Sequence, residues 1–270
     1  MEYNVQITYF ADNKQQVRIY KNSIHLDDDL TAACAEKRQI TKDLKSENDD
    51  IADKAWSLYV SKNRTLNTIY QLTRSYKWDY FITLTFNPAR VNRSDYSDCL
   101  RCASEYFKYL RKTECPKLTW CIVPELHDDG INWHIHGVIG NAQNIKLSDS
   151  GKRWHDQVVY NLTNYIYGYT SATKVINNFA VSHYMTKYIT KNLSLNIKNR
   201  KRFSVSKGLI RPERTVYNLS EKEKLKFIES IGKNILYTKQ IEYENQDITI
   251  IETENFNPIE FMDKMQMYPF

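Results

Sequence analysis

Two histidines are separated by a single isoleucine in the apolar segment 133–139, WHIHGVI. A short apolar segment of this kind favours a β-strand, and in a strand every second side chain points to the same face. His134 and His136 are therefore expected to present both imidazoles on one face. Such a pair can bind a metal ion, but a polar pair on the solvent side of a half-buried strand has the same spacing.

A carboxylate precedes this pair at Glu125, near the end of the preceding apolar run. Asp129 and Gly130 form a turn dipeptide, and a turn there would make the two runs an antiparallel hairpin. The hairpin would bring Glu125 beside the histidines. Two imidazoles and one carboxylate without cysteine suit a partly hydrated Mg²⁺ or Mn²⁺, with zinc as the alternative.

A second group of chemically capable residues lies in the segment 181–193. On a helix, Tyr184, Lys187, Tyr188 and Lys191 would share one face at the spacing i, i+3, i+4 and i+7. A tyrosine can attack a phosphate to form a covalent phosphotyrosine, and a nearby ammonium group lowers the cost of its phenolate. An ordinary amphipathic helix shows the same spacing, so the pattern alone leaves both interpretations open.

These residues need a frame of strands and helices to bring them together. The pattern from residue 78 onward predicts strands at 80–86, 118–126, 133–139 and 169–176 and helices at 96–112, 153–162 and 181–193. Their order is typical of an α+β fold, a ferredoxin-like or RRM-like sandwich. Its central antiparallel sheet would carry the His-x-His motif, and one of its helices would carry the tyrosines.

The remaining parts of the chain differ in composition from this frame. Residues 3–24 predict a β-hairpin, and the segment up to residue 75 is rich in residues that favour helices. We therefore expect an N-terminal appendage over 1–75, a catalytic domain over 76–220 and an acidic C-terminal extension over 221–270. The phosphate-binding sequence GxxxxGK[ST] is absent, so no P-loop ATPase is predicted.

Positive charge is concentrated behind the tyrosines. Nine lysines and arginines stand between residues 185 and 214, against one acidic residue, Glu213. A segment of this kind can follow a phosphate backbone, although a solvated surface has the same composition. The residues expected to bind DNA are Lys198, Arg200, Lys201 and Arg202.

The composition indicates a globular protein, because 41% of its 270 residues are hydrophobic and 13% are aromatic. Five cysteines, an odd number, without an export signal predict free, buried thiols in a cytoplasmic protein. No apolar stretch is long enough to span a bilayer, so no membrane partner is expected.

Three ordered elements resemble the HUH endonuclease superfamily, the rolling-circle replication initiators of small phages, plasmids and single-stranded DNA viruses. Residues 81–88, FITLTFNP, look like its first motif. Residues 125–130 followed by His134-Ile-His136 look like the second motif, and residues 184–191 look like the third. The doubled tyrosine is similar to the two-tyrosine form of the isometric single-stranded DNA phages.

The resemblance implies that the protein nicks and rejoins single-stranded origin DNA through a covalent 5′-phosphotyrosine. It assigns Glu125, His134 and His136 to the metal, and Tyr184 and Tyr188 to nucleophilic attack. Lys187 and Lys191 would then assist the phenolate. Tyr188 stands nearer the apolar stripe of its helix and is expected to cleave first. The host would supply helicase and polymerase in the bacterial cytoplasm.

Several alternatives stay open. A relaxase or a transposase would use the same residues for the same chemistry, and a metal-dependent hydrolase would attack with water instead of tyrosine. A non-catalytic RRM-like module would bind nucleic acid by stacking bases on sheet aromatics, here Phe81, Phe86, Trp120 and Trp133.

Overall fold

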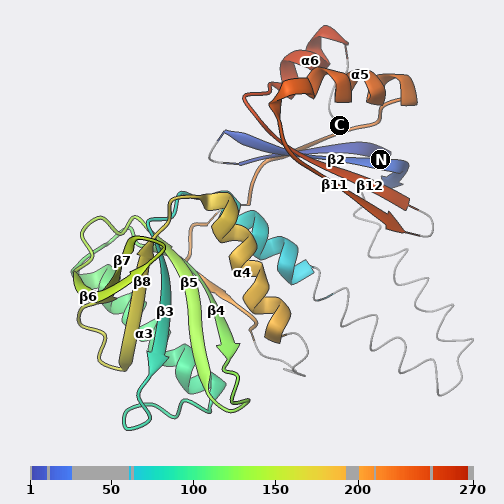
Figure 1. Ribbon diagram of the computed structural model, residues 1–270. Coiled ribbons are helices and arrows are strands. Elements are labelled where there is room, and N and C mark those ends of the chain that lie inside the picture. Colours follow the sequence, from blue (N-terminus) through green and yellow to red (C-terminus); the bar gives the residue numbers. More distant parts are fainter. Residues whose placement is uncertain are drawn as a thin grey trace, which may run out of the picture. The chain divides into compact units, whose positions relative to one another are not determined.

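The computed structural model describes residues 2–10, 13–25, 61, 64–192, 201–209, 211–243 and 246–266. The chain forms two compact units (Figure 1). The central unit is Leu58–Arg211, and the terminal unit joins Met1–Ser57 with Pro212–Phe270. This division differs from the expected segments 1–75, 76–220 and 221–270, because both ends of the chain contribute strands to one sheet.

The terminal unit is built on a five-stranded antiparallel sheet with the order β10-β1-β2-β12-β11. Its strands are β1 (Glu2–Tyr9), β2 (Lys14–His25), β10 (Arg214–Tyr217), β11 (Ile235–Tyr243) and β12 (Gln246–Glu254). The hairpin expected at residues 3–24 is confirmed, since β1 pairs with β2. The outer partners come from the other end of the chain: β1 also pairs with β10, and β2 with β12.

Two helices cover one face of this sheet, α5 (Glu221–Ile231) and α6 (Pro258–Lys264). Phe227 of α5 and Met262 of α6 are buried against Val5, Ile7 and other apolar residues of the strands. No helix within the described ranges has the length and apolar character required to cross a membrane.

The central unit has a seven-stranded sheet with the order β6-β7-β8-β3-β5-β4-β9. Its elements are β3 (Tyr80–Phe86), α3 (Tyr96–Thr113), β4 (Thr119–Leu126), β5 (Trp133–Gly140), β6 (Leu147–Trp154), β7 (Gln157–Leu162), β8 (Gly168–Lys174), α4 (Asn178–Asn192) and β9 (Ser204–Val205), preceded by a helix at residues 64–74. Because β5 lies between β3 and β4, the His-x-His motif occupies a central strand. The expected α+β sandwich is confirmed.

The helix expected at residues 153–162 is wrong, because this segment forms the β6–β7 hairpin. Trp154 pairs with Gln157, and the two residues between them make the turn with positive φ angles, 44° at His155 and 62° at Asp156. Two successive residues with positive φ are the signature of a two-residue hairpin turn, and they end any helix. The β-branched pair that follows the turn favours a strand.

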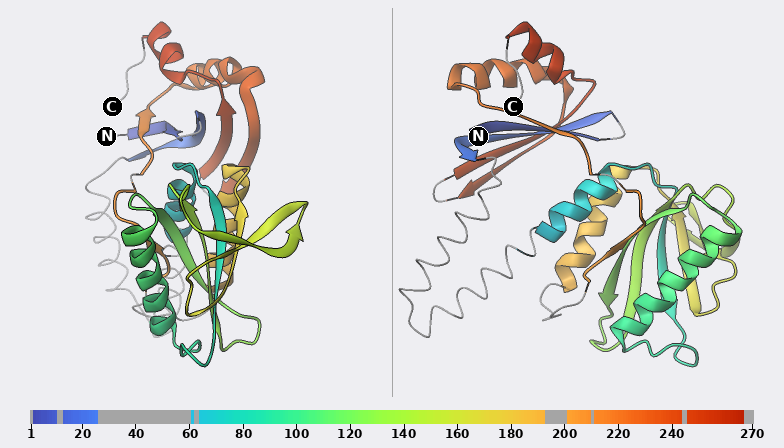
Figure 2. Two further views of the ribbon diagram at one scale, coloured as in Figure 1. Left: turned by 90° about the vertical axis from the view of Figure 1, so that its left-hand side faces the viewer. Right: turned by 180° about the vertical axis from the view of Figure 1, so that it is seen from behind.

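The two faces of the central sheet are covered by different helices (Figure 2). Ile82, Leu84 and Phe86 of β3 are buried on the side of α3, in a core that also holds Phe107 of that helix. The intervening residues of β3 point to the opposite face. There α4 and the helix at residues 64–74 pack on the sheet, with Met185 fully buried.

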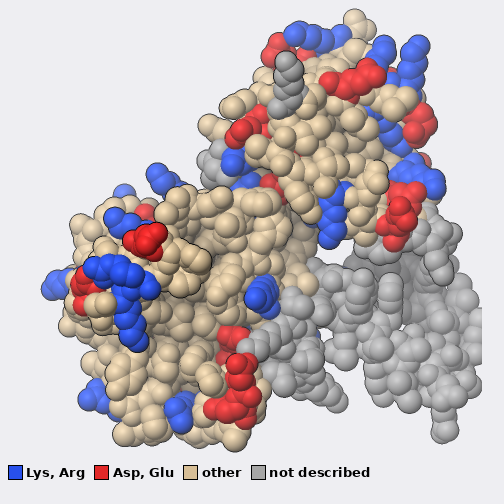
Figure 3. Space-filling view, viewed as in Figure 1, with Lys and Arg blue, Asp and Glu red and all other residues tan. Residues whose placement is uncertain are grey.

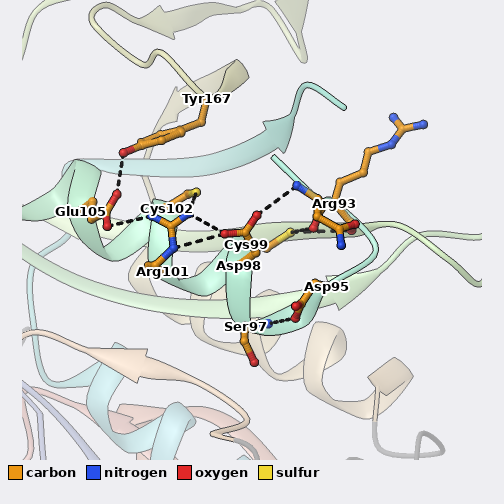
Figure 4. A network of polar contacts seen from close by, with 10 residues as sticks. Arg93, Asp95, Ser97, Asp98, Cys99, Arg101, Cys102, Glu105 and Tyr167 are labelled. Carbon is orange, nitrogen blue, oxygen red and sulfur yellow. Dashed lines mark hydrogen bonds and ion pairs between the residues drawn. The ribbon is translucent and has the colours of Figure 1, made fainter. Parts of the chain in front are cut away.

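A polar network fixes the start of α3 against the loops around it (Figure 4). Arg101 forms ion pairs with Asp98 at 2.5 Å and with Glu105 at 2.9 Å. Asp98 also accepts a hydrogen bond from the backbone amide of Asn92, in the loop after β3, at 3.0 Å. Tyr167, just before β8, donates a hydrogen bond to Glu105 at 2.7 Å. The network therefore ties two loops at one end of the sheet to a single helix.

The cysteines of the central unit are buried thiols. Cys99, Cys102, Cys115 and Cys121 are free and buried, as expected, while Cys34 lies outside the described residues. Burial raises the pKa of the Cys99 and Cys121 thiols to about 12. These thiols therefore stay protonated and unreactive at neutral pH.

Candidate active site

The β4–β5 hairpin positions the three residues expected to bind metal. Glu125 and His134 are direct partners in the antiparallel register, and His136 lies one pair further along, opposite Val123. Partners in a ladder point to the same face. The turn is held by Asp129, whose carboxylate accepts hydrogen bonds from the backbone amides of two residues that follow it. The three side chains thus share one face, as the spacing predicted.

His136 is held through both of its ring nitrogens. Its Nε2 lies 2.6 Å from Oε2 of Glu125, and its Nδ1 lies 3.0 Å from the hydroxyl oxygen of Thr83 on β3. The side chains of His136 and Glu125 are only 11% and 12% exposed. A hydrogen bond to the second nitrogen fixes the tautomer and the ring plane of a metal-binding histidine. Thr83 is positioned to do this.

His134 occupies a more open position. Its ring centroid lies 6.4 Å from that of His136 and 4.9 Å from that of His127 in the turn. Burial lowers the pKa of His134, and the neighbouring His127 and His136 lower it further. The neutral imidazole is the form that binds a metal ion.

The donor set fits a divalent ion in chemistry, with one carboxylate and two imidazoles from adjacent strands on one face. Among the residues that the structure describes, however, no three His, Cys, Asp or Glu side chains are gathered into a closed metal site. Glu125 contacts His136 directly, and His134 stands apart from that pair. Metal binding by these three residues therefore stays a prediction.

The helix expected at residues 181–193 is confirmed as α4, which places the tyrosines over this face. The side chain of Asn177 accepts hydrogen bonds from the amides of Phe179 and Ala180 and thereby caps the first turn. Met185 packs with Val123 of β4 and other residues of the two central strands. This anchor fixes the side of the helix that faces the sheet.

Both tyrosines of α4 belong to an aromatic cluster with His136 and Phe81. The Tyr188 ring stacks on the His136 ring, with centroids 4.0 Å apart and planes at 12°. Phe81 stacks on Tyr188 at 6.1 Å and meets Tyr184 edge-on at 5.3 Å. The two tyrosine rings lie 5.0 Å apart. The structure therefore joins the second and third motifs through direct ring contacts.

The two tyrosines differ in environment. Tyr188 is half-buried, whereas Tyr184 is 42% exposed. Burial raises the pKa of Tyr188 well above its usual range, and a hydrogen bond with Tyr184 raises it further. A phenolate at Tyr188 thus requires a positive charge beside it.

The basic residues are only partly described. Lys187 is exposed on α4. Lys201 is exposed and Arg202 is partly buried, and the carbonyl of Lys201 accepts a hydrogen bond from the Tyr96 hydroxyl. They precede β9, which pairs antiparallel with β4, so they lie toward the end of β4 that carries Glu125. The side chain of Lys191 and the predicted DNA-binding residues Lys198 and Arg200 lie outside the described residues.

The aromatics of the RRM-like alternative are mostly inaccessible. Phe86, Trp120 and Trp133 are 1%, 9% and 7% exposed and belong to the core under α3. Only Phe81 reaches the opposite face, where it contacts the tyrosines. A base-stacking surface made of these four residues is therefore not present.

Thr83 is a contact that the sequence did not reveal, and it can be tested. Thr83→Val removes the hydrogen bond to Nδ1 of His136 while keeping the shape of the side chain. Loss of such a partner typically costs 10- to 100-fold in metal affinity or activity. We expect a loss of about this size in the nicking rate, together with a higher Mn²⁺ concentration for half-maximal rate.

Two further variants control for this result. Thr83→Ser keeps the hydroxyl and should restore most of the rate. Thr173→Val removes a hydroxyl from β8 on the same face and should have little effect on Mn²⁺ dependence. Equal rates and equal Mn²⁺ dependence for Thr83→Val and the unaltered protein would exclude this role.

One family model matches the chain. It describes the replication-associated protein ORF2, and it covers residues 79–193. This span begins immediately before β3 and ends just after α4, so it includes every residue of the aromatic cluster and the β4–β5 hairpin. The match points to a replication-associated protein and is consistent with a rolling-circle replication initiator. Neither the comparison with curated proteins nor that with solved structures gave a match.

Proposed function

We propose that this chain, whose central unit resembles replication-associated proteins, nicks and rejoins single-stranded DNA at a replication origin. The observation that carries the proposal is the contact between Tyr188 and the histidine motif. The phenol ring stacks at 4.0 Å on His136, which in turn contacts Glu125 at 2.6 Å. A nucleophile and a metal-binding carboxylate-histidine pair in one cluster suit covalent phosphoryl transfer.

In the proposed reaction, the hydroxyl oxygen of the tyrosine attacks the phosphorus of a phosphodiester. A bond forms between this oxygen and phosphorus, and the bond between phosphorus and the 3′ oxygen breaks. The phenol loses its proton, and the leaving 3′ oxygen gains one. The products are a 5′-phosphotyrosine and a free 3′ hydroxyl, and attack by that hydroxyl reverses the step and rejoins the strand.

Each residue of the cluster has a part in this proposal. A Mg²⁺ or Mn²⁺ held by Glu125, His134 and His136 would withdraw charge from the phosphate and favour the phenolate. Thr83 orients His136, and Phe81 supports the rings of both tyrosines. Lys187 and Lys191 are proposed to offset negative charge beside the phenolate.

The free 3′ hydroxyl would prime the polymerase of the host. Because the sequence has no P-loop motif, we propose that a host helicase unwinds the duplex. The relaxase and transposase alternatives use the same chemistry and predict the same intermediate. They differ in what joins the cleaved end, not in the residues that cleave.

The proposal is tested by trapping the intermediate. The full chain is incubated with a single-stranded origin oligonucleotide and Mn²⁺, and the products are separated under denaturing conditions. We expect a covalent protein-DNA adduct and a shorter fragment with a 3′ hydroxyl. Cleavage without an adduct would indicate a hydrolase that uses water, and binding without cleavage would indicate a non-catalytic module.

The basic segment gives a separate prediction. Replacing Lys198, Arg200, Lys201 and Arg202 together by glutamine should weaken DNA binding and flatten its dependence on salt. Each lost phosphate contact lowers the slope of log affinity against log salt by about 0.7 for single strands. The slope is measured by titration at several salt concentrations. An unchanged slope would show that these residues form a merely solvated surface.

A further inference from the structure

A row of four side chains crosses the central sheet at the open end of the candidate site. The register pairs Glu125 with His134, His134 with Thr85, and Thr85 with Tyr169. Partners in neighbouring antiparallel strands point to the same face. Tyr169 on β8 therefore lies on the face of the histidine motif, two strands away from His134, at about 10 Å between backbones.

Access to this face increases toward that row. The row nearest the middle of α4 ends in Val138 and Cys121, which are fully buried beneath the helix. In the row of Tyr169, by contrast, each side chain is at least partly accessible, and Tyr169 itself is 74% exposed. Figure 3 shows that uncharged side chains form most of the surface over the central strands. An exposed aromatic ring thus stands beside the site on a surface with few charges.

The position of Tyr169 is fixed by the residue before it. Gly168 pairs with Phe86 of β3, and a Cβ atom at Gly168 would lie 2.1 Å from the carbonyl oxygen of Thr85. Only glycine allows this approach. The amide of Asn87 donates a hydrogen bond to the carbonyl of Tyr167 at 2.8 Å, which holds the same end of β8. The ring is therefore presented from a rigid strand rather than from a loop.

We propose that Tyr169 is a stacking platform for an unpaired base of the DNA strand whose phosphate enters the site. This inference rests on the proposed nicking function and adds a positioning residue to it. A flat ring binds the face of any base, which suits a single strand, whereas a paired base has its faces covered by its neighbours. Hydroxyl groups of Thr85 and Ser171 lie beside the ring for contacts with the backbone or base edges.

Trp154, the other exposed aromatic side chain on a strand of this sheet end, fits this role less well. It stands at the tip of the β6–β7 hairpin, where it meets the His155 ring edge-on at 4.4 Å. The neighbouring Arg153 is paired with Asp149 at 3.1 Å, which offsets its charge. No register pair connects this tip to the histidine motif. The cross-strand row therefore favours Tyr169.

The test measures binding of the full chain to a fluorescently labelled oligo-dT. Tyr169→Ala should weaken binding about 5- to 150-fold, the range for loss of one stacked base. Tyr169→Phe and Tyr169→Trp keep an aromatic ring and should bind within a few fold of the unaltered chain. Tyr109→Ala removes a tyrosine that is 41% exposed on α3, over the opposite face, and should leave affinity unchanged.

Two measurements separate stacking from other causes. A stacking contact involves no phosphate, so the salt slope of Tyr169→Ala should equal that of the unaltered chain. With an oligonucleotide whose bases are replaced by abasic sites, the difference between the two proteins should disappear. A reduced salt slope, a loss that persists on abasic DNA, or an affinity equal to that of the unaltered chain would overturn the proposal.

The outcome is distinguishable from failure of the nicking function. If the unaltered chain forms no adduct while Tyr169→Ala still loses affinity only for strands with bases, nicking is refuted and stacking is supported. If the unaltered chain forms the adduct and Tyr169→Ala binds and reacts like it, nicking is supported and stacking is refuted. Thermal unfolding should be unaltered, because the ring of Tyr169 is mostly exposed.

Discussion

Tyr188→Phe is expected to reduce the first nick by on the order of a thousandfold or more, because it removes the attacking oxygen. Phenylalanine preserves the ring that stacks on His136 and Phe81, so the fold and DNA affinity should change little. The rate is measured in a single turnover with excess protein. Tyr188 is favoured for this step because its ring contacts the histidine that also contacts Glu125.

Tyr184→Phe is expected to spare the first nick but to impair termination. Its ring lies 5.0 Å from that of Tyr188 and is 42% exposed, so a small shift of α4 or of the DNA would bring it to a phosphate. It would then attack the regenerated origin while the first phosphotyrosine is resolved. The double variant should form no adduct at all.

Mass spectrometry of the trapped complex decides the assignment. DNA attached to Tyr188 after the first nick supports the order given above, and DNA attached only to Tyr184 reverses it. DNA attached to neither residue would show that the tyrosines are not the nucleophiles.

Loss of either histidine is the second large effect that we expect. His134→Ala and His136→Ala should each abolish nicking in Mg²⁺ and in Mn²⁺. Most of the non-specific DNA affinity should remain, since it comes from phosphate contacts elsewhere. Nicking, binding and thermal unfolding are measured on the same preparations. Full cleavage by either variant would refute the assignment of these residues to the metal.

Two further substitutions separate chemistry from packing. His136→Ala also removes the ring beneath Tyr188, so Glu125→Gln provides a variant that keeps the shape of the site and removes only the negative charge. It should lose nicking as well. His155→Asn changes a histidine in the β6–β7 turn, where asparagine tolerates the positive φ of 44°, and should nick normally.

The frame around the site was largely predictable because its elements carry strong local patterns. The alternation in β3 and the two apolar strands around Asp129-Gly130 define a hairpin whose faces follow from a period of two. The spacing of the tyrosines predicted α4 in the same way. Local pattern failed at residues 153–162, where the apolar spacing imitates a helix and the turn at His155 and Asp156 uses no glycine.

What the sequence did not predict depends on pairing between distant strands. The contact of Thr83 with His136 requires the register of β3 against β5, and the position of Tyr169 requires that of β8 against β3. Neither register is encoded by a local signal. The assembly of both chain ends into one sheet was missed for the same reason, since β1 and β10 are joined through the entire central unit.

That assembly has a consequence for the order in which the units form during synthesis. The β1–β2 hairpin emerges first from the ribosome, yet its partners β10 and β12 emerge only after the central unit is complete. At about 5 to 20 residues per second, the hairpin waits on the order of ten to forty seconds for them. A two-stranded hairpin is at best marginally stable alone. The nascent chain therefore completes the candidate site while its first strands still have open edges, where a chaperone or a second nascent chain can bind.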